Sequence, residues 1–216
     1  MERHVIASFV YPFRAGGRLG RWLIGVCLVA LLPLSFPLVF GYAVACVRAA
    51  ACDPASPPPR WRIAPRLVAD GWWAALQAAV LTAPFALAAW ALAGLVARAW
   101  RPTGDAFLDA ALAWIVAVTA AALPWGVLML VLVPPTLASY AVTGRPGDLA
   151  RPRLVVSCVR ARYADWNLVL VGITTVWALA VLGLAFAGVG IVPGAFYAIL
   201  VSAHACSALS PHRSAR

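Results

Sequence analysis

The sequence contains no lysine, and charged residues of any kind make up only 11% of its 216 residues. Charge is missing altogether from four long segments, residues 22–47, 71–97, 110–144 and 166–212. Helices of a soluble protein need a solvated polar face, so this segregation of charge excludes an ordinary soluble fold. A bilayer imposes it, because a charge at the hydrocarbon centre costs several kcal/mol. The pattern therefore predicts a polytopic membrane protein.

Sequence signatures of catalysis and metal binding are missing as well. The five cysteines form no C-x-x-C pair, and the chain has no phosphate-binding loop, nucleophile elbow or H-E-x-x-H motif. None of the seven acidic residues falls inside a charge-free segment, where ion-coupled transporters and intramembrane proteases usually place ionisable groups. We therefore expect a non-enzymatic protein with no catalytic residue, no metal site and no cofactor.

Hydrophobicity and arginine are what the sequence has in abundance. Hydrophobic residues make up 64% of the chain and the mean hydropathy is +0.90, whereas soluble domains are about 45–50% apolar. The formal net charge is +10, and its arginines flank the hydrophobic segments. That position favours membrane orientation and anionic lipid binding over binding of nucleic acid. We predict an all-α membrane helix bundle, a single integral membrane domain over residues 1–216.

The boundaries of the predicted spans follow from length, because a transmembrane helix needs about 20 apolar residues. Residues 71–97 and 110–142 each provide one span. The last apolar stretch provides two, at 166–187 and 191–209, divided near Gly188 and Gly190. The remaining parts are a basic lead-in at 1–21, a proline-rich linker and interfacial segment at 48–70, and an interfacial helix at 151–165.

The first apolar segment, residues 22–47, permits two topologies. It is long enough for one span, but Pro33 and Pro37 near its middle also permit a hairpin that returns to its own side. A span divides the arginines 11 to 6 between the two sides of the membrane, whereas a hairpin divides them 15 to 2. Because positive residues gather on the cytoplasmic side, we prefer the hairpin with four full spans and cytoplasmic termini. Five spans are the alternative.

Three arginine-rich segments precede the hydrophobic units and are predicted to form basic helices in the headgroup plane. In each of them arginine and proline lead to a tryptophan, a residue typical of the membrane interface. The arginines recur at helical spacing and share a helix face. We expect contact with anionic lipid headgroups, with a partner membrane protein or with a second copy of the chain from Arg14, Arg18, Arg21, Arg62, Arg66, Arg153 and Arg160.

The lead-ins, together with a proline–tyrosine pair in or after each apolar unit, suggest a threefold internal repeat. The pairs are Pro37 and Tyr42, Pro135 and Tyr140, and Pro193 and Tyr197. Internal symmetry is common in membrane folds. Chance similarity in a chain rich in alanine, valine, leucine, arginine and proline is the alternative.

His204 is the one ionisable side chain inside a predicted span. One interpretation is a channel or transporter for a small or amphiphilic solute, with a polar path formed by His204, Ser202, Asn167 and Thr174. The other is that His204 forms an ordinary hydrogen bond between helices, which is the more frequent role of an isolated polar residue in a span.

Several short motifs resemble domain-of-unknown-function family 4013, a family of uncharacterised prokaryotic integral membrane proteins. The motifs are Tyr11-Pro12-Phe13, Trp22-Leu23-Ile24-Gly25, Pro37 to Gly41-Tyr42, Arg48, Pro59-Arg60-Trp61 and Asp70-Gly71. The later stretch from Pro135 to Tyr140 and the arginine-rich helix before Trp166 are similar too. Pro58 stands where the family usually has leucine, and no acidic residue follows Trp61. The resemblance implies an integral membrane protein with several spans and implies no activity.

Overall fold

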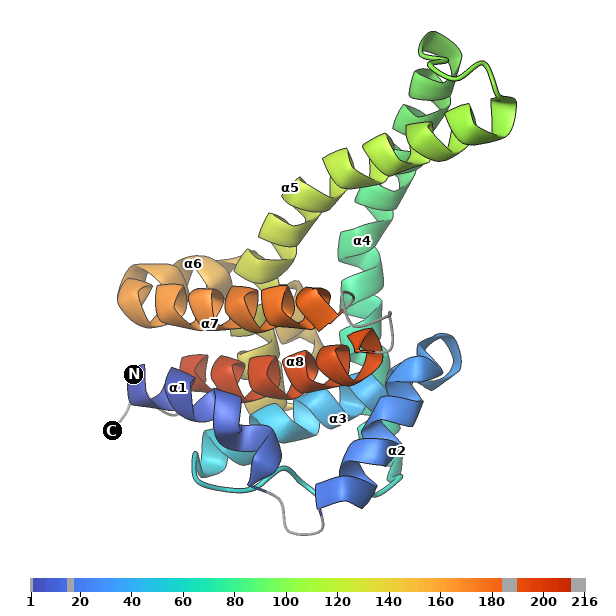
Figure 1. Ribbon diagram of the computed structural model, residues 1–216. Coiled ribbons are helices and arrows are strands. Elements are labelled where there is room, and N and C mark those ends of the chain that lie inside the picture. Colours follow the sequence, from blue (N-terminus) through green and yellow to red (C-terminus); the bar gives the residue numbers. More distant parts are fainter. Residues whose placement is uncertain (1, 15–17, 184–189, 211–216) are drawn as a thin grey trace. The chain divides into compact units, whose positions relative to one another are not determined.

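The computed structural model describes residues 2–14, 18–183 and 190–210 (Figure 1). In these ranges the chain is helical and contains no strand, which confirms the predicted all-α fold. Five of the described helices are long and apolar enough to cross a membrane, so the five-span alternative fits the structure. They are α3 (Leu32–Cys52), α4 (Pro65–Ala99), α5 (Ala106–Thr143), α7 (Tyr163–Leu182) and α8 (Ile191–Cys206), the last extended by a 3₁₀ turn, η4 (Ser207–Leu209).

The predicted spans agree with these helices. Residues 71–97 lie within α4, residues 110–142 within α5, and residues 191–209 coincide with α8 and η4. The span predicted at 166–187 corresponds to α7, which begins earlier, at Tyr163. Its last residues and the predicted break at Gly188 lie outside the described residues.

Of the three predicted basic helices, one forms, one is part of a longer helix and one is divided into shorter elements. The third forms as α6 (Pro152–Ala161). The second does not form separately, because Pro65 begins α4, which continues without interruption to Ala99 and leaves Arg62 outside the helix. The first is divided into α1 (Glu2–Val10), a 3₁₀ turn η1 (Tyr11–Phe13) with proline in its first positions, and α2 (Arg18–Ala30). Arg14 therefore shares no helix face with Arg18 and Arg21, and that prediction was wrong.

The contacts divide the chain into two compact units, which are described separately. Unit 1 comprises Met1–Ala75 and Leu132–Arg216, and unit 2 comprises Leu76–Val131. Helix α8 is central to unit 1, where it packs against α1, α2, α3 and α7. Figure 1 shows it running beside α7. The apolar core between them consists of Val176, Ala180, Ala198 and Val201, with Phe9 and Tyr197 packed against it.

Helices α2 and α3 form a hairpin within unit 1. The chain turns at Leu31, and the two helices pack against each other. The segment that precedes α2 returns to the linker that follows α3, since Arg14 donates a hydrogen bond to the Pro54 carbonyl at 2.8 Å. In addition, the His4 ring bonds the His204 carbonyl near the end of α8 at 3.1 Å. The start of the linker (residues 53–64), at Pro54, therefore lies beside the N-terminal arm (residues 2–14) and the end of α8, whereas Trp61, later in the linker, packs against Tyr42 and Phe196.

Helices α3 and α4 cross at two glycines. A Cβ atom on Gly71 would overlap the carbonyl oxygen of Pro37, and one on Gly41 would overlap the carbonyl oxygen of Leu67. Backbones approach this closely only where side chains are absent, a common device for packing helices in membranes. The two glycines therefore fix the crossing point of α3 and α4.

The three repeated tyrosines each attach their helix to another segment. Tyr42 donates a hydrogen bond to the Pro59 carbonyl at 2.9 Å, and Tyr197 donates one to the Phe9 carbonyl at 2.8 Å. Tyr140 donates to the carboxylate of Asp70, also at 2.9 Å. The tyrosines of the three proposed repeats thus share a role, although their acceptors differ.

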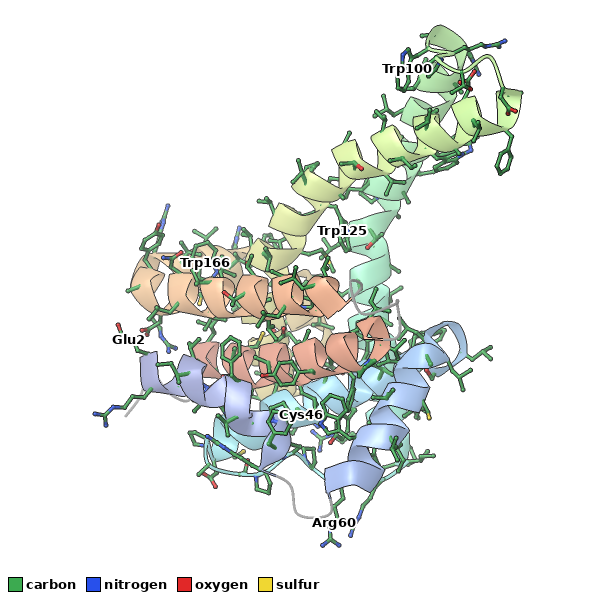
Figure 2. All side chains as sticks on the ribbon, viewed as in Figure 1. Glu2, Cys46, Arg60, Trp100, Trp125 and Trp166 are labelled. Atoms are coloured by element: carbon green, nitrogen blue, oxygen red, sulfur yellow. The ribbon has the colours of Figure 1, made fainter. Side chains whose placement is uncertain are left out.

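Unit 2 is a hairpin formed by the second part of α4 and the first part of α5. Small residues meet along its inner side, where Ala89, Ala93, Ala113 and Ala117 are buried. The indole of Trp125, labelled in Figure 2, donates to the Thr82 hydroxyl at 3.0 Å. Asp105 caps α5 by accepting hydrogen bonds from the backbone N–H groups of Phe107 and Leu108, as expected for an acid at the positive end of a helix.

The glycine crossing predicts that Gly71→Ala destabilises the protein. The added methyl group forces α3 and α4 apart, and overpacking of this kind typically costs about 1–3 kcal/mol. Thermal unfolding of the detergent-solubilised protein, followed by size-exclusion chromatography after heating, should show a lower transition temperature. Gly94→Ala in the same helix is the matched control, since a Cβ there meets no atom within 4 Å. Equal transition temperatures for the two variants would contradict the assigned crossing.

Candidate functional site

His204 lies at the centre of a buried polar cluster that joins three segments of unit 1, and it is itself fully buried. Its Nδ1 atom lies 2.8 Å from the Ser8 hydroxyl of α1, and its Nε2 atom lies 3.2 Å from the Pro54 carbonyl of the linker. The rings of His4 and His204 stack with their centroids 4.5 Å apart. The Ser207 hydroxyl donates to the His204 carbonyl at 2.7 Å. The cluster attaches α1 and the linker to the end of α8.

The hydrogen bonds of the cluster are compatible with two neutral histidines. Carbonyl oxygens only accept, so the Nε2 atoms of His4 and His204 each carry a hydrogen. The Ser8 hydroxyl can donate either to the His204 ring or to the His4 carbonyl, which lies 3.0 Å away. The Tyr11 ring also lies against His204, with centroids 4.4 Å apart. Burial, and next the adjacent Cys46 thiol of α3 (labelled in Figure 2), raise the pKa of Tyr11, so its hydroxyl stays protonated.

The other residues of the predicted solute path lie elsewhere. Asn167 and Thr174 are exposed on α7, and neither belongs to the hydrogen-bonded cluster around His204. Ser202 is partly buried on α8, and its hydroxyl has no hydrogen-bond partner among the described residues. The structure thus brings His204 together with residues of α1 and the linker, an arrangement that matches the interpretation of His204 as a bond between helices.

A second cluster surrounds Asp70, near the start of α4. Its buried carboxylate accepts hydrogen bonds from Arg48 of α3 at 2.8 Å and from Tyr140 of α5 at 2.9 Å. Arg48 also donates to the Ala141 carbonyl at 2.7 Å. Arg66 lies one turn before Asp70, with its Nε atom 3.9 Å from the carboxylate. A buried charge needs such partners, and here they hold three helices together.

Two further arginines hold the end of unit 1 together. Arg151 donates to the buried carboxylate of Asp148 at 3.1 Å, within the 3₁₀ turn η2 (Pro146–Ala150) and its flank. Arg162 stands between α6 and α7, where its side chain donates to the Ala208 carbonyl at 2.6 Å and pairs with Asp165 at 3.4 Å. The Arg162 side chain is mostly buried by these contacts, whereas the Arg151 side chain stays exposed beside its partner.

The arginines predicted to contact lipid are mostly exposed. Arg62, Arg66, Arg153 and Arg160 are exposed on unit 1, and Arg14 is partly buried beside the linker. The side chains of Arg18 and Arg21 lie outside the described residues. Helix α6 has the two faces that its sequence predicts, with Val155 buried and Leu154, Cys158 and Val159 partly buried, while Arg153, Ser157 and Arg160 point outward. Its apolar face packs on protein, including α7.

The sequence alone did not identify several members of these clusters. His4 and Ser8 gave no signal, because their partner His204 lies about two hundred residues away in the chain. Arg48 and Tyr140 meet Asp70 across 22 and 70 positions. Arg66, one turn before Asp70 in the same helix, is the partner that lies close to it in the sequence.

The histidine cluster predicts that His204→Leu destabilises the protein. The substitution removes the ring bonds to the Ser8 hydroxyl and the Pro54 carbonyl, and loss of a buried hydrogen bond typically costs about 1–3 kcal/mol. We expect a lower thermal transition temperature for the detergent-solubilised protein.

His4→Gln is the milder variant, because it keeps a donor for the His204 carbonyl and leaves the bonds of His204 to Ser8 and Pro54 in place. It should lower the transition temperature less than His204→Leu does. Equal transition temperatures for His204→Leu and the unaltered protein would show that the cluster does not stabilise the fold.

With the apolar helices and the charged clusters described, the chain can be compared with known proteins. No curated protein and no solved structure matches the chain. A family model described as "Protein of unknown function (DUF4013)" matches residues 24–201, which include α3 to α7 and most of α2 and α8. The match covers most of the chain and agrees with the resemblance seen in its motifs, and we conclude that this protein belongs to the DUF4013 family.

Proposed function

We propose that this protein is a non-enzymatic integral membrane protein whose arginine-rich surface binds anionic lipid headgroups. This surface consists of the exposed Arg62 in the linker and Arg153 and Arg160 on α6. The observation that carries the proposal is the arrangement of α6. The helix is held on the protein by its apolar face, and it presents Arg153 and Arg160 outward. An amphipathic helix fixed in this way keeps its guanidinium groups available to phosphates, with which arginine forms paired hydrogen bonds.

The division of charge between the two units supports the proposal. Unit 1 contains 15 arginines and 5 acidic residues, whereas unit 2 contains 2 of each. The whole formal excess of +10 therefore belongs to unit 1. In the part of the chain that the structure describes, Asp70 and Asp148 pair with Arg48, Arg66 and Arg151, whereas Arg62, Arg153 and Arg160 form no ion pair.

The positive-inside rule supports an orientation for this surface. Short loops rich in arginine remain in the cytoplasm, and the cytoplasmic leaflet carries the anionic lipids. We propose that the N-terminal arm, the linker and the α6 region face the cytoplasm, together with the C-terminus. Membrane lipids are then the partners, rather than nucleic acid. A partner membrane protein or a second copy of the chain is the alternative binding partner of these exposed arginines.

The proposal predicts a preference for anionic lipid that depends on the exposed arginines. The protein would be reconstituted in membranes that contain spin-labelled phosphatidylglycerol or phosphatidylcholine, and the bound fraction measured by electron spin resonance. Substituting Arg62, Arg153 and Arg160 by glutamine should lower the preference for phosphatidylglycerol. The decrease should reach up to about fivefold per arginine, because each basic residue near an anionic surface contributes about 1 kcal/mol.

The matched control replaces Arg98 and Arg101 of unit 2 by glutamine, and it should leave the preference unchanged. Salt should weaken the preference of the unaltered protein, since exposed charges are screened. A preference that survives the triple substitution, or one that falls equally in the control, would exclude the α6 region as the lipid-binding surface.

A further inference from the structure

An apolar groove opens on unit 1 between η1, α2, α7 and α8. Its volume is about 610 Å³, and its walls include Phe13, Trp22, Leu23, Leu179, Pro193 and Tyr197. This volume lies in the usual range for ligand sites in proteins, about 300–1,000 Å³. Leu179 and Pro193 belong to helices that are long and apolar enough to span a membrane, so the occupant must itself be compatible with the hydrocarbon.

The aromatic wall of the groove is held in place by contacts with the rest of unit 1. The Phe13 ring lies between Trp22 and Tyr197, with centroid distances of 6.5 and 5.9 Å. Tyr197 is fixed by its hydrogen bond to the Phe9 carbonyl, and Trp22 packs edge-on against Phe196 at 5.7 Å. These contacts already hold the aromatic side chains in place. The side chains therefore lose little conformational entropy when an apolar chain binds, which favours binding.

The charge around the groove selects the kind of occupant. Arg14 directly follows Phe13, and α2 carries Arg18 and Arg21 immediately before Trp22. No acidic residue occurs in the sequence between Glu2 and Asp53, so nothing in this stretch of chain balances these three arginines. The sequence next to the aromatic wall is therefore strongly basic, while the walls themselves are apolar. An occupant that matches both features has a hydrocarbon chain and an anionic head.

We propose that the groove binds one acyl chain of an anionic membrane phospholipid, whose charge is favoured by the basic sequence that contains Arg14, Arg18 and Arg21. This inference rests on the proposed function and deepens it. It adds a discrete site of defined stoichiometry to the diffuse attraction of lipid by exposed arginines.

The test counts bound lipid molecules by native mass spectrometry of the detergent-solubilised full-length protein. The probes are phosphatidylglycerol and phosphatidylcholine with the same two oleoyl chains. We expect one phosphatidylglycerol molecule to bind before all others, and phosphatidylcholine to bind more weakly at that step. Leu179→Trp fills the groove and should weaken this first step by about tenfold. Leu182→Trp is the matched control, because Leu182 is a similarly exposed leucine of the same helix that does not line the groove.

A second pair of variants keeps the test valid if Leu179→Trp fails to fold. Leu23→Trp fills the groove from α2, and Leu34→Trp alters an exposed leucine of α3 outside it. Equal binding by the filled and control variants, with the preference for phosphatidylglycerol retained, would overturn the groove and leave the proposed function intact. Equal binding of the two lipids by the unaltered protein would overturn both.

Discussion

The attachment of the N-terminal arm to the end of α8 is the interaction on which the rest of unit 1 depends. His4 and Ser8 of α1 meet His204, and Arg14 meets the linker at Pro54. These contacts require α2 and α3 to form a hairpin, because the chain must return to the end it left. They also place η1, and with it the aromatic wall of the groove, against α8.

The hydrocarbon surroundings of the spans explain where the charged side chains are found. Water is absent from the hydrocarbon, so ionisable groups there need protein partners or must reach an interface. Arg48, Asp70 and Tyr140 satisfy one another near the ends of three helices, and Arg162 holds the chain after α8. Arg62, Arg153 and Arg160 are exposed and form no ion pair with the other described residues. A structural set and an exposed set of arginines thus coexist in unit 1.

The sequence predicted those features of the fold that depend on local pattern. Charge-free length located the spans, and the spacing of Arg153, Ser157 and Arg160 identified the outward face of α6. Arg162 does not share that face, because it lies between α6 and α7, where its guanidinium donates to the Ala208 carbonyl. The basic helix predicted before Gly71 does not form separately. Pro65 instead begins α4, since proline is favoured in the first turn of a helix.

Contacts between distant residues were beyond prediction from one sequence. Nothing near His4 or Arg48 in the chain indicates His204 or Asp70 as a partner, since such pairs are set by how the helices pack. The glycine crossing of α3 and α4 is another example, because Gly41 and Gly71 resemble any other glycine until the Pro37 carbonyl is seen to lie where a Cβ would stand.

The central proposal is that the N-terminal arm and the linker share the cytoplasmic side of the membrane, from which α4 crosses to the other side. Cysteine accessibility in intact cells tests it most directly, with Glu2, Ala55 and Thr103 replaced singly by cysteine in a cysteine-free background. The account predicts that a membrane-impermeant reagent added outside labels only position 103. Labelling of position 2 without position 55, or of position 55 without position 2, would place the arm and the linker on opposite sides and contradict the hairpin.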